Sequence, residues 1–103
     1  MNEAYRRFLV VIRVDPQDLG PAVKLMMTKL EGLALGETRL AFSSLKGETF
    51  GVFMKSRKAA GLISATLTNQ YIKGDKTFVM VTEVGEEWGG AGNSRGWEWL
   101  QHH

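Results

Sequence analysis

The sequence predicts an α+β fold in which four strands and two helices follow the order strand, helix, strand, strand, helix, strand. Three observations predict it. Residues 8–12 are apolar throughout and are mostly β-branched or aromatic, which favours a strand covered on both faces. Apolar residues then recur at three- and four-residue steps over residues 22–33, which is typical of one helix face. The rest of the chain repeats this alternation of apolar strands and amphipathic helix.

The first strand and helix have recognisable ends. The strand is expected over residues 6–14, and Asp15-Pro16 ends it because proline cannot donate to a β-ladder. Pro21 is well placed as an early residue of the helix, with Asp18 or Gly20 near its amino-terminal cap.

The second half supplies three more apolar segments. In the second strand, Leu40 and Phe42 should share one face. Ser56 is a good cap for the second helix. The expected elements are strands over 38–42, 48–54 and 76–84, a helix over 57–68, and a turn at 74–75.

Two right-handed crossovers turn this order into a four-stranded antiparallel sheet with both helices on one face, a ferredoxin-like βαββαβ sandwich. The first and third strands are then central. Hydrophobic residues make up 44% of the chain and charged residues 23%, which is ordinary for a globular protein. We expect residues 1–103 to form a single ferredoxin-like domain with a Gly/Trp-rich carboxyl-terminal tail from about residue 85.

Apolar residues on the face of the sheet away from the helices predict a dimer, because monomers rarely expose a large apolar patch. Either the tryptophan tail folds over that face or a second subunit covers it, and both can hold. We expect a two-fold symmetric homodimer, sheet against sheet or edge to edge. The tryptophans serve as packing anchors in this view and as base-stacking groups in the alternative one. The expected packing residues are Leu9, Val11, Phe53, Trp88, Trp97 and Trp99.

The composition excludes several kinds of chemistry. The chain has no cysteine, which excludes disulfides, thiolate metal sites and a cysteine nucleophile and fits a reducing compartment. The only histidines are His102 and His103, so no internal histidine base and no serine triad is available. The sequence shows no signal-peptide cleavage site and no apolar run near the ~20 residues of a membrane span. We therefore expect a cytoplasmic protein with no membrane partner.

One short basic run is the best polar signal for function. Lys55, Arg57 and Lys58 surround the predicted helix cap, where the helix dipole is already positive. A phosphate group bound there would relieve the repulsion among these cations. We predict a nucleic-acid backbone contact at Lys55, Arg57, Lys58 and Arg13, and the alternative is an ordinary solvated basic face.

The second half also carries an ordered series of short motifs. They are Ser44-Leu45-Lys46-Gly47-Glu48, Gly74-Asp75-Lys76-Thr77-Phe78, Trp88-Gly89-Gly90 and Trp99-Leu100. In this order the series resembles the SinR-like small ferredoxin-fold proteins, relatives of the small CRISPR adaptation subunit and of VapD-type ribonucleases. The resemblance covers roughly residues 40–100 and implies the same sandwich and a homodimer.

The resemblance also implies an alternative activity, because some members of the wider group are metal-dependent nucleases. These use an aspartate at the end of the first strand, paired across the dimer axis, to hold a divalent metal. In the expected register Arg13 takes that place, and a two-residue slide would supply Asp15. Asp15 is therefore the candidate catalytic and metal-binding residue, with Mg²⁺ or Mn²⁺ as its cofactor. Otherwise Asp15 makes the turn before Pro16.

Three functions follow from these patterns. The leading hypothesis is a homodimeric binding protein without an intact catalytic apparatus, for which nucleic acid is the first partner to test. The second is a divalent-metal-dependent nuclease. The third is a protein-interaction module that offers its sheet edge to another protein.

Overall fold

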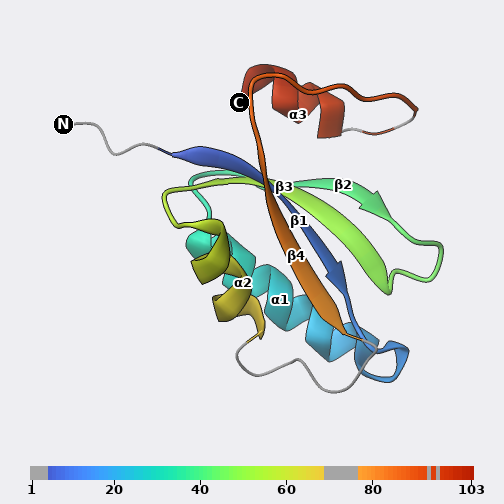
Figure 1. Cartoon of the computed structure of the whole chain (residues 1–103). Coiled ribbons are helices and arrows are strands. Elements are labelled where there is room, and N and C mark those ends of the chain that lie inside the picture. Colours follow the sequence, from blue (N-terminus) through green and yellow to red (C-terminus); the bar gives the residue numbers. More distant parts are fainter. Residues whose placement is uncertain (1–4, 69–76, 93, 95) are drawn as a thin grey trace.

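A computed structural model gives the fold and describes residues 5–68, 77–92, 94 and 96–103. In this part of the chain, four strands form one antiparallel sheet and three α-helices pack against it (Figure 1), which confirms the predicted α+β class. The elements in chain order are β1 (Arg6–Arg13), a short 3-10 helix η1 (Pro16–Asp18), α1 (Leu19–Leu33), β2 (Arg39–Ser43), β3 (Thr49–Ser56), α2 (Ala60–Thr68), β4 (Phe78–Val84) and α3 (Gly96–His102).

The strands of the described sheet lie in the order β2-β3-β1-β4, and all three neighbouring pairs are antiparallel. β1 and β3 are therefore the inner strands, and β2 and β4 are the edges. β1 pairs with β3 on one side and with β4 on the other. Side chains of β1 pack into a core cluster on each face of the sheet, which explains why residues 8–12 are apolar on both faces.

The helices α1 and α2 cover one face of the sheet, which we call the helix face (Figure 1). Every second residue of β1 and β3 points to this face, as the two-residue period of a strand requires. The buried side chains there come from both strands and both helices. They are Phe8, Val10, Ile12, Val14, Ala22, Met26, Leu30, Phe50, Val52, Met54, Ile63 and Leu67.

The opposite face, which we call the open face, is covered in part by α3 (Figure 1). The segment predicted as a tail includes this helix, which was not predicted from the sequence. After β4 the chain returns across the sheet, and α3 contacts β2 and β3. Trp99 is buried on Phe53, with ring centroids 5.9 Å apart and planes only 7° from parallel. The carboxyl-terminal segment thus folds over one part of this face, as one of the two predicted explanations requires.

The prediction for the faces of β2 is wrong. Leu40 lies opposite Val52, whereas Phe42 lies opposite Gly51, because the register shifts at Ala41. The extra residue of this β-bulge breaks the two-residue period and turns Phe42 to the open face, where its ring lies against Gly51. Leu40 remains on the helix face.

The helix starts also differ from those predicted. Asp15 caps η1, which leads directly into α1 at Leu19, so the helical path begins before Asp18 and Gly20. The helix α2 begins only at Ala60. The predicted turn at 74–75 and the start of the last strand at Lys76 lie outside the described residues. None of the described helices is both long and apolar enough to cross a bilayer.

Candidate functional site

The pairing of β1 with β3 gathers basic residues at one end of the sheet. Arg6 lies opposite Ser56, and Arg7 lies opposite Lys55. The start of β1 therefore adjoins the end of β3 and the loop that follows it. We call this group of cations, from Arg6 and Arg7 to Lys55, Arg57 and Lys58, the basic end.

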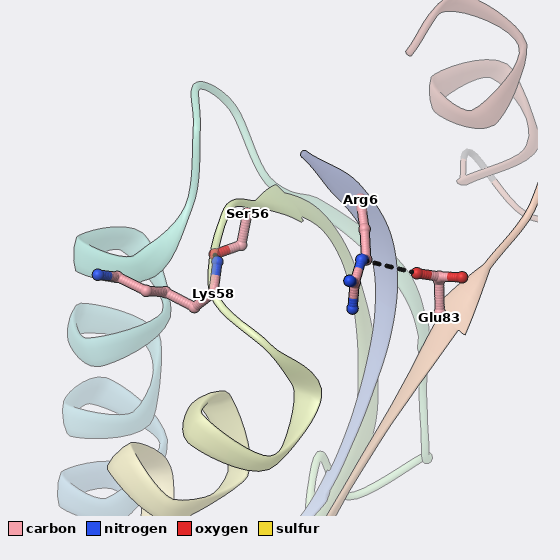
Figure 2. Close-up of polar contacts among 4 residues, drawn as sticks. All are labelled: Arg6, Ser56, Lys58 and Glu83. Carbon is pink, nitrogen blue, oxygen red and sulfur yellow. Dashed lines mark hydrogen bonds and ion pairs between the residues drawn. The ribbon is translucent and has the colours of Figure 1, made fainter. Parts of the chain in front are cut away.

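Ser56 shapes the loop that leaves the basic end. It is fully buried; its hydroxyl donates a 2.8 Å hydrogen bond to the carbonyl oxygen of Leu33 and accepts one of 3.0 Å from the backbone N–H of Lys58 (Figure 2). These bonds turn the chain out of β3. The prediction that Ser56 caps the second helix is wrong, because α2 begins at Ala60. The cations precede the helix, so the helix-dipole argument for an anion at Ser56 does not apply.

Arg6 and Arg7 have partners within the chain. The Arg6 side chain forms an ion pair with Glu83 on the neighbouring strand β4, with 3.3 Å between Nε and Oε1 (Figure 2). Both side chains are more than half exposed, so the pair is worth only about 0–1 kcal/mol and an incoming anion can compete for Arg6. Arg7 donates hydrogen bonds to the carbonyl oxygens of Leu100 and Gly85, which assigns it to holding the carboxyl-terminal segment.

The other cations of the basic end face outward. Arg57 and Lys58 are exposed, and in Figure 2 the Lys58 side chain points away from Arg6. The Lys55 ammonium lies 5.1 Å from the centroid of the Tyr5 ring, a cation–π contact at a half-exposed aromatic side chain. The basic end therefore combines several spread cations with one accessible ring, a combination that suits a flexible polyanion carrying aromatic groups.

Arg13 is not part of the basic end. It lies opposite Thr49, at the other end of β1 and β3, whereas Lys55 is opposite Arg7. The six residue-to-residue steps from Thr49 to Lys55 correspond to roughly 20 Å of extended strand. Arg13 is exposed, and the structure does not bring it together with the other predicted nucleic-acid contacts.

Asp15 lies just after β1 and has a local role. Its carboxylate accepts a 3.1 Å hydrogen bond from the backbone N–H of Gln17 and caps η1. Within the described residues, no group of three or more histidine, aspartate or glutamate side chains is placed to hold a metal ion. The geometry of Asp15 is that of a turn residue.

Most of the predicted packing residues form one cluster on the open face. Phe53 and Trp99 are buried together with Leu100, and Leu9 packs against them from β1. Trp88 and Trp97 stack on each other, with ring centroids 5.9 Å apart, at the rim of this cluster. Val11 is the exception, because it lies further along β1 outside the cluster. The structure gives all three tryptophans packing contacts within the chain.

An open groove of about 810 Å³ lies beside the basic end, between the start of β1 and the carboxyl end of α3. Tyr5, Arg6, Glu83 and Trp88 are among the side chains that line it. It offers aromatic faces, two guanidinium groups, and carboxylate and imidazole groups, which together can bind a polar or aromatic ligand.

Sequence reasoning missed Tyr5 and Arg6 as members of this site. The only signal that could have found them is the β1–β3 register, which local patterns leave open. No family model, curated protein or solved structure matches this chain. The interpretation of the site therefore depends on its geometry.

Proposed function

We propose that the chain is a ferredoxin-like, homodimeric, cytoplasmic binding protein whose basic end contacts the backbone of a single-stranded nucleic acid. The strand order β2-β3-β1-β4, with both crossover helices on one face, supports the ferredoxin-like assignment. Kinship with SinR-like proteins, which only the sequence motifs suggest, stays part of this proposal. The absence of cysteine agrees with the reducing cytoplasm.

The observation that carries this proposal is the register between β1 and β3. It places Arg6 beside Ser56, and so beside the Lys55–Lys58 run, although these segments lie far apart in the sequence. Cations on neighbouring chain segments can follow successive phosphates, and the exposed Tyr5 ring beside Lys55 can stack on an unpaired base. Stacking of this kind contributes about 1–3 kcal/mol per base, which favours single strands over duplexes.

The test is a titration of fluorescently labelled single-stranded oligonucleotides by anisotropy, from about 50 to 200 mM salt. The double variant Arg57→Ala/Lys58→Ala should bind more weakly to every sequence. Its plot of log affinity against log salt should also be shallower by about 0.7 for each phosphate that the variant no longer neutralises. Tyr5→Ala should weaken single-strand binding without changing the salt slope.

A matched control removes the same charge elsewhere. Lys24, on α1, and Lys46, in the turn between β2 and β3, are both exposed and lie outside the basic end. The variant Lys24→Ala/Lys46→Ala should keep most of the affinity. Equal losses of affinity in the two double variants would show that net charge alone explains the effect, and would reject the basic end as the site. Affinity that does not change with salt would reject it as well.

The same oligonucleotides, incubated with Mg²⁺ or Mn²⁺, test the nuclease alternative. If the wild type cleaves the oligonucleotides and Asp15→Ala does not, the function is that of a nuclease and not of a binding protein. Persistence of the same cleavage in Asp15→Ala would identify a contaminating nuclease. Capture of a protein partner by a chain that binds no oligonucleotide would favour the protein-interaction module.

A further inference from the structure

The two edges of the described sheet differ in how well they are protected against pairing with another strand. β2 has five residues, and its pairing with β3 is interrupted by the bulge between Leu40 and Phe42. β4 has seven residues, and its pairing with β1 is continuous from Val84 to Phe78. Short length, bulges, proline and charged side chains are usual protections of an edge, and of these β4 has only Glu83, next to its last residue.

The uncovered part of the open face adjoins this unprotected edge. α3 contacts β2 and β3, whereas β4 forms the opposite edge of the sheet (Figure 1). Phe78 and Met80 point to the open face from β4 and are 43% and 53% exposed. Val11, which pairs with Met80, continues the same apolar strip onto β1.

The helix beside β4 is uncharged. α2 packs against β4, and its sequence from Ala60 to Thr68 contains no acidic or basic residue. Leu62 on this helix is 50% exposed, and Ala65 is exposed one turn further on. β4 itself carries no charge from Phe78 to Thr82. Among the described residues, α2 and the part of β4 from Phe78 to Thr82 thus carry no charge where the two elements pack together.

We propose that a second copy of this chain pairs along β4, antiparallel, so that the two sheets form one continuous eight-stranded sheet. An antiparallel pair of identical strands has two-fold symmetry, in which the residue on the axis meets its own counterpart and its neighbours pair reciprocally. The uncharged stretch from Phe78 to Thr82 is centred on Met80, which the proposal places on the axis. A charge there would meet a like charge, so an uncharged strip suits a second copy better than it suits a charged partner. The pairing also satisfies the outward N–H and C=O groups of β4.

This arrangement would create a site that one copy lacks. The uncovered halves of the two open faces would adjoin along the axis and form one apolar floor from Val11, Phe78 and Met80 of both copies. The two α3 helices would border this floor on either side, because each lies over the far strands of its own sheet. The proposal deepens the homodimer of the proposed function and rests on it, and it names the surface that pairs.

Met80→Lys tests the interface, with Leu40→Lys as the matched control. Leu40 is 52% exposed and lies on the other edge strand, so both variants place a lysine at an equally accessible strand position. Wild type and Leu40→Lys should sediment at twice the 11.5 kDa of the chain at tens of micromolar. Met80→Lys should sediment as a monomer with an unchanged circular dichroism spectrum.

Charge exchange keeps the test decisive even if one variant is poorly folded. An equimolar mixture of Met80→Lys and Met80→Glu should recover the dimer, since opposite charges would then meet near the axis. A wild-type monomer at these concentrations, or a dimer that Leu40→Lys disrupts and Met80→Lys does not, would overturn the proposal.

The lack of native cysteine allows a direct check of proximity. A single Met80→Cys substitution should give a covalent dimer under mild oxidation, whereas Leu40→Cys should not, and the reverse result would refute pairing along β4. The oligonucleotide titration separates the two proposals. A β4-paired dimer that binds no oligonucleotide would refute only nucleic-acid binding. A dimer that binds oligonucleotide but persists in Met80→Lys would refute only the edge pairing, and a wild-type monomer would refute the homodimer together with the edge pairing.

Discussion

The guanidinium group of Arg7 donates a 2.9 Å hydrogen bond to the carbonyl oxygen of Leu100, which lies 93 residues further along the chain. The same group also donates to the carbonyl oxygen of Gly85, directly after β4. One side chain of β1 therefore fixes both ends of the segment that crosses the open face. A cation at the last carbonyls of α3 is also favoured by the helix dipole.

We predict that Arg7→Ala lowers the free energy of unfolding by about 2–3 kcal/mol, because the partly buried carbonyl oxygen of Leu100 and the exposed one of Gly85 both lose a charged donor. Urea unfolding measures this loss. Arg13→Ala, which removes an exposed arginine from the other end of the same strand, should change stability by less than about 0.5 kcal/mol. Similar midpoints for the two variants would show that Arg7 does not anchor the segment.

The second prediction concerns the indole of Trp99. Its ring is buried on Phe53, but its Nε1 atom has no acceptor within the described part of the chain. Trp99→Ala should destabilise the protein by about 3–5 kcal/mol, as expected for a truncated core aromatic residue. Trp99→Phe keeps a stacking ring and removes an unsatisfied donor, so it should lose only about 1 kcal/mol. A loss in Trp99→Phe as large as in Trp99→Ala would reveal a hydrogen bond of Nε1 in solution.

The third prediction compares two glycines that touch aromatic rings. A Cβ atom at Gly96 would overlap the ring of Phe53, and one at Gly51 would overlap the ring of Phe42. Phe53 is buried in a stack and cannot move aside, whereas Phe42 is 44% exposed and can rotate into solvent. Gly96→Ala should therefore cost about 1–3 kcal/mol and Gly51→Ala less than about 1 kcal/mol, as thermal unfolding can measure. The opposite order would mean that the Phe53 stack is loose.

The fourth prediction concerns the buried hydroxyl of Ser56. Ser56→Ala leaves the Leu33 carbonyl oxygen and the Lys58 N–H without their partner, at a loss of about 1–3 kcal/mol. Ser64→Ala removes a hydroxyl that bonds only within α2 and should be nearly neutral. Because the Ser56 hydroxyl also fixes the backbone at Lys58, Ser56→Ala should bind oligonucleotides more weakly than the wild type. An unchanged salt slope in a destabilised Ser56→Ala protein would separate its structural role from the proposed function.

Much of the fold can be predicted from local patterns. The apolar run of β1 indicated a strand covered on two sides, and the structure places β1 between β3 and β4 with packing on both faces. The face of α1 that carries Met26 and Leu30 follows from three- and four-residue spacing. These features depend only on the period of a strand or a helix, which neighbouring residues reveal.

The features that were missed depend on long-range packing. α3 has seven residues and starts at a glycine, so it is too short to be stable alone and exists because Trp99 stacks on Phe53. The bulge at Ala41 is invisible to a two-residue pattern, since Leu40 and Phe42 alternate as a regular strand would.

Only part of the candidate site could be predicted from the sequence, for the same reason. The run Lys55–Lys58 is local and was found, whereas the contribution of Arg6 depends on how two distant strands align. The role of Ser56 was misassigned because a serine before a basic run looks like a helix cap. Its hydroxyl instead bonds the Leu33 carbonyl at the end of α1, a partner that local spacing does not indicate.

The return of the chain across the open face also sets the order in which the protein can be completed during synthesis. All four described strands leave the ribosome before α3 does, so Leu9 and Phe53 stay exposed to solvent until α3 has been synthesised. A product cut short before Gly96 keeps this aromatic surface displayed, which is what chaperones and proteases recognise. Synthesis of α3 is thus the step that removes this aromatic surface from solvent.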